Sequence, residues 1–159
     1  MAGLEDLYRE IILDHYRSPR NRGVLDTPPA HKVEGYNPLC GDEIVLYLQV
    51  EDGAVSDVKI GGQGCSISQS SASMMSAAIK GKSVAEVRAL VRAFKALMSI
   101  HETRLGGDSD DDAMDEAPVE DVKLGDLEAL QGVVKFPVRI KCATLSWNTL
   151  TQALAESGV

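Results

Sequence analysis

The chain has 159 residues, of which 44% are hydrophobic, and this is enough for one compact domain with a hydrophobic core. Its net charge of −8 argues against a nucleic-acid-binding protein, because a phosphate-binding surface needs an excess of Lys and Arg. No apolar run approaches the roughly 18 residues of a transmembrane helix, and no basic region followed by an apolar stretch opens the chain, so we expect a cytoplasmic protein.

The first part of the chain predicts a helix, a linker and a β-hairpin. Apolar residues recur at helical spacing over residues 4–17, which predicts an amphipathic helix that Pro19 ends. Residues 18–31 are rich in Pro, Arg, Asn and Gly and are expected to form a linker. Alternating apolar side chains predict a strand over residues 44–50, and the turn dipeptide Asp52-Gly53 predicts a partner strand over residues 55–60.

The second part predicts helices. Gly61, Gly62 and Gly64 are expected to break the second strand, and a Ser- and Ala-rich helix is expected over residues 66–80, with Cys65 at its N-terminus. Residues 83–86 have the form of a capping box, which predicts that another helix follows directly. Pro137 suits the first turn of a final helix. A hairpin-based sheet covered by helices is an α+β fold.

The negative charge is concentrated in one segment. Residues 105–122 contain eight acidic residues and no Lys or Arg: Asp108, Asp110, Asp111, Asp112, Asp115, Glu116, Glu120 and Asp121. Because these side chains would repel one another and bury little apolar surface, we expect an acidic insertion loop at about residues 100–122 within a single domain over residues 1–159.

The three histidines are expected to be structural rather than ligands. His15 lies on the apolar edge of the first helix, where a packed and hydrogen-bonded side chain is expected. His31 and His101 are expected in loops at the surface.

Cysteine is the residue type that indicates a reactive or metal-binding site. Three cysteines at wide and uneven spacing make a poor disulfide framework, so free thiols in a reducing compartment are expected. Extended backbone at residues 40–42 would direct the side chains of Cys40 and Asp42 to the same face. Cys65 and Cys142 both lie near expected helix starts, where the helix dipole favours thiolate, and Lys141 beside Cys142 could add an electrostatic contribution.

The three cysteines and Asp42 are residue types that bind metal ions, and they also have a structural interpretation. Three thiolates and one carboxylate would complete a closed tetrahedral zinc site. Any one of the cysteines taken alone is better interpreted as a small buried hydrophobic residue, and the chain has no C-x-x-C pair. The residues by themselves therefore indicate a candidate thiol cluster and no more.

Three short motifs carry a resemblance to a known family. They are N-P-L-C-G-D (residues 37–42), G-C-S-I-S (residues 64–68) and R-I-K-C-A-T-L-S-W (residues 139–147), and they resemble the cysteine motifs of the SufU/IscU-like iron–sulfur cluster assembly family in order, flanks and separation. The resemblance includes D-H-Y-R-S-P-R-N-R-G (residues 14–23) and so runs nearly end to end. It implies the IscU-like fold, with helices on a small, mainly antiparallel sheet of about three strands.

The resemblance also implies a site. Cys40, Asp42, Cys65 and Cys142 would meet at one exposed edge, where they would hold zinc, or alternatively iron or a 2Fe–2S cluster. The sulfur would come from a SufS-like cysteine desulfurase and pass to downstream cluster-assembly machinery. Cys40 is the sulfur acceptor that the resemblance implies, since the residues alone do not separate it from the other two cysteines.

Two departures place the chain nearer to one branch of that family. Scaffolds of the IscU type have His before the third cysteine, where this chain has Lys141, and their chaperone-recognition motif L-P-P-V-K is K-F-P-V-R here (residues 135–139). The acidic segment resembles an insertion of the SufU branch. The resemblance therefore implies a zinc-dependent sulfurtransferase, with a 2Fe–2S assembly scaffold and a non-catalytic, zinc-stabilised interaction module as the alternatives.

Overall fold

The structure is a computed structural model that describes residues 4–27, 30–38, 41–104, 125–135 and 137–157. Cys40 lies outside these ranges, and so do residues 105–122 of the acidic loop expected at about residues 100–122.

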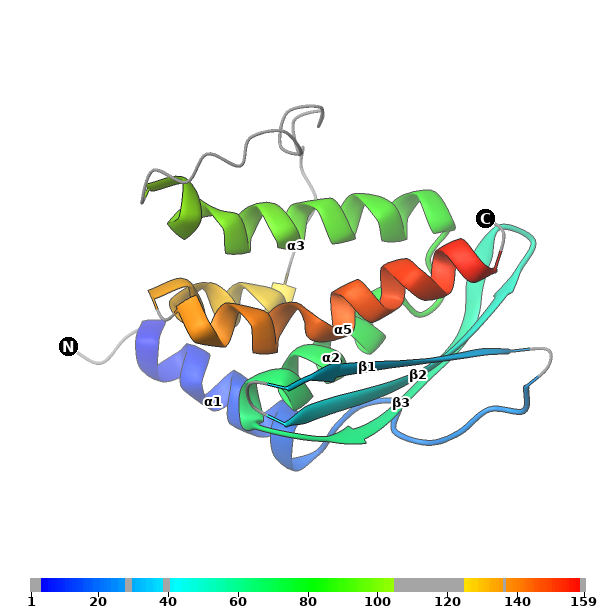
Figure 1. Ribbon diagram of the computed structural model, residues 1–159, viewed down its shortest axis with the longest axis horizontal. Coiled ribbons are helices and arrows are strands. Elements are labelled where there is room, and N and C mark those ends of the chain that lie inside the picture. The colour runs from blue at the N-terminus through cyan, green and yellow to red at the C-terminus, as the bar shows by residue number, and fades with distance from the viewer. Residues whose placement is uncertain (1–3, 28–29, 39–40, 105–124, 136, 158–159) are drawn as a thin grey trace.

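A three-stranded antiparallel sheet forms one layer of the molecule (Figure 1). Its strands are β1 (His31–Asn37), β2 (Asp42–Glu51) and β3 (Ala54–Gln63), in the spatial order β1-β2-β3. Side chains alternate along β2, so that Ile44, Leu46 and Leu48 are fully buried while their neighbours are exposed or half-buried. This alternation is typical of a sheet with one face on the core and one face toward solvent.

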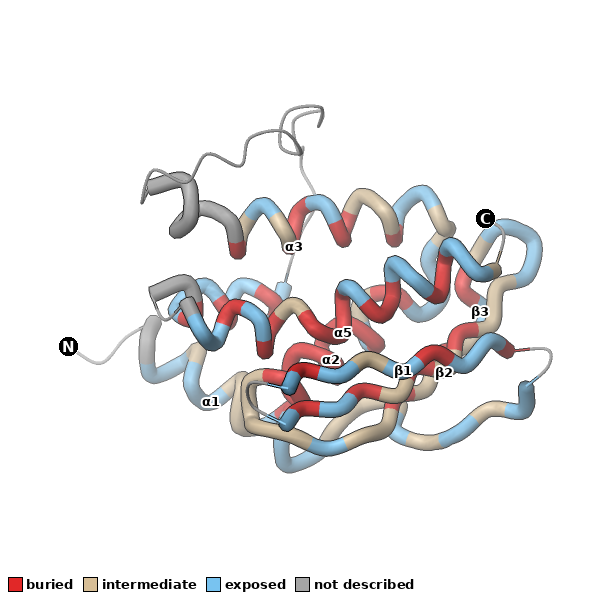
Figure 2. Tube along the Cα trace, viewed as in Figure 1, coloured by how far each residue is buried: buried red, intermediate tan, exposed pale blue. Residues whose placement is uncertain are grey.

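Helices cover the buried face of the sheet. α2 (Ser66–Ile79) packs on β3, α5 (Pro137–Glu156) packs on β1 and β2, and α1 (Leu4–Arg17) packs against α2. α3 (Val84–Arg104) and the 3-10 helix η1 (Gly125–Lys135) contact each other and α5. Figure 2 shows the buried positions gathered where α2, α5 and the sheet meet. The predicted α+β class is confirmed, with three strands as expected.

Local signals account for the element boundaries. Asp52 and Gly53 both have positive φ angles, of 54° and 76°, as a two-residue hairpin turn requires. The Ser83 hydroxyl accepts a hydrogen bond from the Glu86 backbone N–H at 3.1 Å, and the Glu86 carboxylate accepts one from the Ser83 N–H at 2.9 Å. This reciprocal pair is the predicted capping box at the start of α3.

Three local expectations are wrong. β3 does not end at the glycines but continues through them to Gln63, because it stays paired with β2 as far as Glu43. His31 begins strand β1 instead of lying in a loop. The sequence of β1 lacks a clear strand pattern, and backbone pairing with β2 stabilises the strand. His101 belongs to α3, which extends to Arg104.

The core holds the large side chains between the sheet and the helices. Trp147 of α5 and Phe94 of α3 are fully buried and stacked, with ring centroids 4.5 Å apart and planes 14° apart. His15 is 2% exposed and hydrogen-bonded through both ring nitrogens, to Ser73 at 2.8 Å and to Asp126 at 3.0 Å, which confirms its structural role. No helix within the described ranges is both long enough and apolar enough to cross a membrane.

Candidate metal centre

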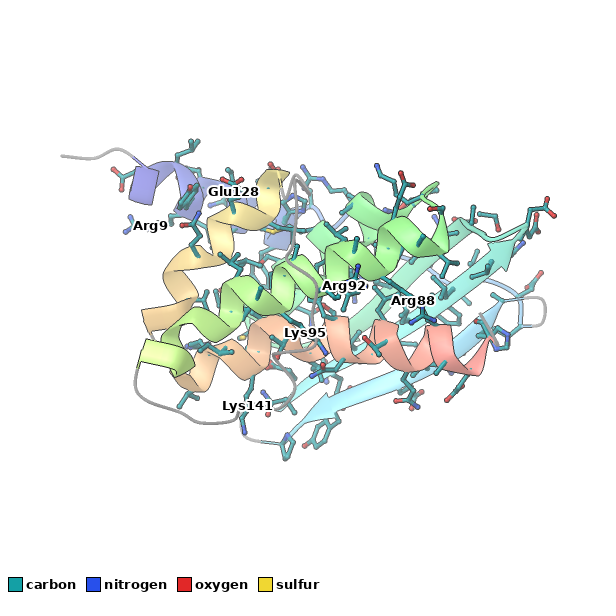
Figure 3. The ribbon with its side chains drawn as sticks, turned by 90° about the horizontal axis from the view of Figure 1, so that it is seen from above. Arg9, Arg88, Arg92, Lys95, Glu128 and Lys141 are labelled. Carbon is teal, nitrogen blue, oxygen red and sulfur yellow. The ribbon has the colours of Figure 1, made fainter. Side chains whose placement is uncertain are left out.

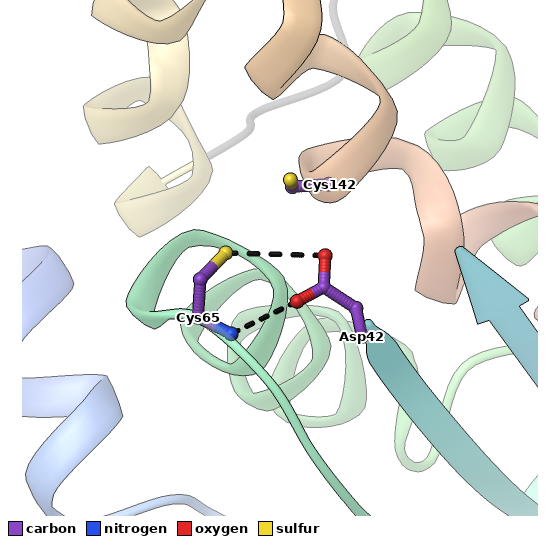
Figure 4. A group of neighbouring side chains, drawn as sticks. All are labelled: Asp42, Cys65 and Cys142. Carbon is purple, nitrogen blue, oxygen red and sulfur yellow. Dashed lines mark hydrogen bonds between the residues drawn. The ribbon is translucent and has the colours of Figure 1, made fainter. Parts of the chain in front are cut away.

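Two thiols and one carboxylate converge where β2, α2 and α5 meet (Figure 4). Asp42 is the first residue of β2, Cys65 directly precedes α2, and Cys142 lies in the second turn of α5. Their candidate ligand atoms all lie within 4.8 Å of one another. The structure therefore brings together three of the four predicted site residues, and the fourth, Cys40, is outside the described residues.

The Asp42 carboxylate is fully buried and held from two sides. Its Oδ1 accepts a hydrogen bond from the Cys65 backbone N–H at 2.9 Å, and its Oδ2 lies 3.5 Å from the Asn37 side-chain amide and 3.9 Å from the Cys65 Sγ. Burial by itself would raise the pKa of Asp42, but hydrogen bonds from the Cys65 backbone and from the Cys142, Ser68 and Cys65 side chains outweigh it and lower the pKa below its usual value. Asp42 is therefore an anion at neutral pH.

Cys65 is the N-cap residue of α2. It has the extended backbone that this position requires, with φ −74° and ψ 170°, and its Sγ accepts a hydrogen bond from the Ser68 backbone N–H at 3.5 Å. The prediction that Cys65 lies at a helix N-terminus is confirmed.

The backbone at Gly41 differs from the extended conformation expected from the sequence. Gly41 lies in a turn with φ +71°, and its N–H donates to the Asn37 carbonyl at 2.8 Å, so the backbone at Gly41 is not extended. The expected extended backbone is therefore wrong at Gly41, and the placement of Cys40 relative to Asp42 stays a prediction because Cys40 lies outside the described residues. A left-handed turn favours glycine, which gives Gly41 a conformational role in this motif.

Cys142 is fully buried and is the sixth residue of α5. Cys142 therefore lies beyond the first turn of α5, and the dipole effect of a helix end falls off over that distance. Its Sγ lies 3.9 Å from the Asn37 side-chain nitrogen, which also faces Asp42. Sequence reasoning missed Asn37, and its place at the start of N-P-L-C-G-D was the signal available.

Lys141 is exposed, whereas Cys142 beside it is buried, because adjacent residues of a helix point in different directions. Lys141, Lys95 and Asn37 line a hollow of about 500 Å³ between α5, α3 and β1, and Figure 3 shows the first two on α5 and α3 respectively. Burial lowers the pKa of Lys95. The predicted electrostatic effect of Lys141 on Cys142 stays a prediction.

The donor set fits a thiophilic metal. Zinc accepts Cys sulfur and Asp oxygen together, and a site with two thiols suits soft metal ions better than magnesium or calcium, which take oxygen ligands. The hydrogen bonds to Asp42 resemble the outer contacts that orient ligands in metal sites. Asp42, Cys65 and Cys142 can therefore supply three ligands.

Comparisons with known proteins find relatives along nearly the whole chain. The family model described as the NifU-like N-terminal domain matches residues 7–143. The zinc-dependent sulfurtransferase SufU of Bacillus subtilis (strain 168) is 46% identical over 155 residues, which cover 98% of this chain and 94% of that protein. The iron–sulfur cluster assembly scaffold protein IscU of Streptococcus pyogenes serotype M1 is 37% identical and covers 99% of this chain and 88% of that protein.

A solved structure is similar along almost the whole chain. It is a candidate iron–sulfur cluster assembly scaffold protein for the SUF system of Fervidobacterium islandicum AW-1, with a TM-score of 0.72 and 33% identity. The match covers 96% of this chain and 99% of that one.

Proposed function

Because the chain belongs to the NifU-like N-terminal domain family, we propose that it works in iron–sulfur cluster assembly as a zinc-dependent sulfur-transfer protein. It accepts persulfide sulfur from a cysteine desulfurase and passes it to the downstream assembly machinery. The observation that carries this proposal is the convergence of Asp42, Cys65 and Cys142 within 4.8 Å, on elements far apart in the sequence. A relay needs free thiols, so the proposal also places the protein in the cytoplasm, where thiols are kept reduced.

The metal ligands in this proposal are Asp42, Cys65, Cys142 and, as the fourth, Cys40. Zinc bound by them would keep the thiols in the thiolate form until a partner docks. The chain itself holds the weakest of these ligands in place, because the Cys65 N–H fixes one oxygen of Asp42 and the Asn37 amide faces the other.

Sulfur transfer in this proposal is a thiol–persulfide exchange. The thiolate of Cys40 attacks the outer sulfur of the donor's cysteine persulfide, a new S–S bond forms, and the donor's S–S bond breaks. The donor cysteine leaves as a thiolate, so the exchange needs no external oxidant or reductant. In the metal-free protein the ionised Asp42 instead accepts hydrogen bonds from the Cys65 and Cys142 thiols.

A scaffold is the second candidate function. The 37% identity to a protein named as an IscU scaffold favours it, and so does the chemistry of the site, because thiolates are the usual ligands of iron–sulfur clusters. In that case a 2Fe–2S cluster would be the cargo of the same residues. A non-catalytic zinc-stabilised interaction module would also use them, but it would leave desulfurase turnover unchanged.

Two measurements separate these candidates. Protein purified without air should contain stoichiometric zinc and be colourless if it is a relay, whereas a brown 2Fe–2S cluster would favour the scaffold. Turnover of a SufS-like desulfurase at saturating cysteine should rise when the protein is added. An unchanged turnover would favour the inert module and contradict the relay.

Serine variants of the three cysteines test the acceptor. Cys40→Ser should abolish the stimulation, because an alcohol is a far weaker nucleophile than a thiolate at neutral pH, while zinc content falls less. Cys65→Ser and Cys142→Ser should lose zinc more strongly. Wild-type stimulation by Cys40→Ser, with persulfide found on Cys142, would show that the acceptor is assigned to the wrong cysteine.

A further inference from the structure

A buried serine hydroxyl connects the two helices that carry the described thiols. Ser71 of α2 is fully buried, and its Oγ donates a hydrogen bond to the Ala143 carbonyl of α5 at 2.6 Å. The same oxygen accepts a hydrogen bond from the Trp147 indole Nε1–H at 3.1 Å. One hydroxyl thus contacts α5 at two points a helical turn apart.

These contacts lie close to the candidate ligands. Ala143 directly follows Cys142, and Ser71 is six residues along α2 from its N-cap residue Cys65, a distance of about 9 Å at 1.5 Å per residue. A helix transmits a displacement almost rigidly over so short a length. A shift where Ser71 meets α5 would therefore change the separation between the Cys65 and Cys142 sulfur atoms.

We propose that Ser71 is a positioning residue that sets the distance between the Cys65 and Cys142 thiols. The inference deepens the proposed function, because it concerns the same candidate metal centre. Trp147 supports the bridge, since its ring stacks on Phe94 of α3 and this contact orients the indole N–H toward Ser71. Removing the hydroxyl leaves the Trp147 N–H and the Ala143 carbonyl to find other partners in a closely packed interior.

The neighbouring serine offers a matched control. Ser70 is also fully buried, but its hydroxyl donates to the Ile67 carbonyl of its own helix at 3.2 Å. Ser70→Ala and Ser71→Ala therefore remove the same atom from adjacent buried positions of α2. Trp147→Phe is a third variant, which removes the indole N–H and keeps an aromatic ring against Phe94.

The first measurement is zinc affinity by competition with a chromophoric chelator, together with the absorption spectrum of the Co²⁺-substituted protein. Ser71→Ala should weaken zinc binding by about tenfold, the lower end of what is typical when residues that orient metal ligands are changed. Trp147→Phe should act in the same direction, and Ser70→Ala should stay within about twofold of the wild type. A purely structural role would lower the melting temperature and leave both the affinity and the Co²⁺ spectrum unchanged.

The second measurement needs no metal. Phenylarsine oxide bridges two thiols only when their sulfur atoms are close, so its affinity for the metal-free Cys40→Ser chain reports the placement of Cys65 and Cys142. This affinity should fall several-fold when Ser71→Ala is added and stay unchanged when Ser70→Ala is added. Failure of the Cys40→Ser chain to bind the arsenical, or equal effects of the two serine variants, would overturn the positioning role. If the wild type bound no zinc, the proposed function would fail, while the arsenical would still decide the role of Ser71.

Discussion

Cys65 has two separable roles in this structure, and replacing it with Ser and with Ala distinguishes them. It is a candidate metal ligand, and it is also the N-cap of α2, with its Sγ accepting a hydrogen bond from the Ser68 N–H. Serine is among the preferred N-cap residues and alanine is not. Cys65→Ser therefore removes the thiol and keeps a cap, whereas Cys65→Ala removes both.

The expected magnitudes differ between the metal-free and zinc-bound proteins. Without metal, Cys65→Ala should be less stable than Cys65→Ser by about 1 kcal/mol, the usual cost of losing an N-cap. In a domain of this size that difference lowers the melting temperature by about 3 °C. Zinc at a hundred times its dissociation constant stabilises the wild type by about 2.7 kcal/mol, and both variants should gain much less because each lacks one ligand.

Thermal unfolding followed by circular dichroism, with a chelator and then with added zinc, measures both effects. We expect metal-free Cys65→Ser to melt at or above the wild type and Cys65→Ala to melt below both. With zinc, the wild type should melt highest. Equal melting temperatures for the two metal-free variants would refute the capping role, and full stabilisation of both by zinc would refute the ligand role.

Three further outcomes are expected. A Cβ on Gly64, where φ is +158°, would lie 2.5 Å from the Asp42 Oδ1, so Gly64→Ala should lower both the zinc affinity and the melting temperature. The control is Gly53→Ala, which should leave the zinc affinity unchanged because Gly53, at φ +76°, faces open space. Because the folded state lowers the pKa of Asp42 from 3.8, its ionised form stabilises the metal-free protein above about pH 4, and this contribution is lost as pH falls through the lowered pKa. Urea unfolding should accordingly show a stability gap between wild type and Asp42→Asn that closes in acid; a constant gap down to pH 2 would contradict the assignment. Deleting residues 106–118 should leave the melting temperature nearly unchanged, because repelling carboxylates bury little apolar surface, and a large drop would show that the segment is part of the core.

Features set by neighbouring residues were predictable from the sequence. The capping box of Ser83 and Glu86, the hairpin turn at Asp52-Gly53 and the N-terminal position of Cys65 all arise within a few residues, because they satisfy backbone groups or φ angles locally. The spacing of apolar residues likewise located α1, α2 and the two strands of the hairpin.

The strand β1 and the end of β3 were not predictable in this way. β1 has one buried apolar side chain, Val33, so its sequence lacks the alternation that marks a strand, and pairing with β2 stabilises it instead. The glycines of β3 weaken strand formation locally, but the paired backbone of β2 continues beside them as far as Gln63. Pairing between strands is a tertiary effect that a local pattern does not contain.

The geometry of the candidate site was decided by the tertiary structure. The sequence motifs indicated which residues to expect together, but the distances among Asp42, Cys65 and Cys142 depend on how β2, α2 and α5 pack. The roles of Asn37 and Ser71 depend on the fold, which places their side chains beside Cys142 and Ala143, 105 and 72 residues away in the chain. Contacts across such separations arise from packing of the whole core, so the residue types and motifs indicated a candidate thiol cluster, whereas its geometry depended on the fold.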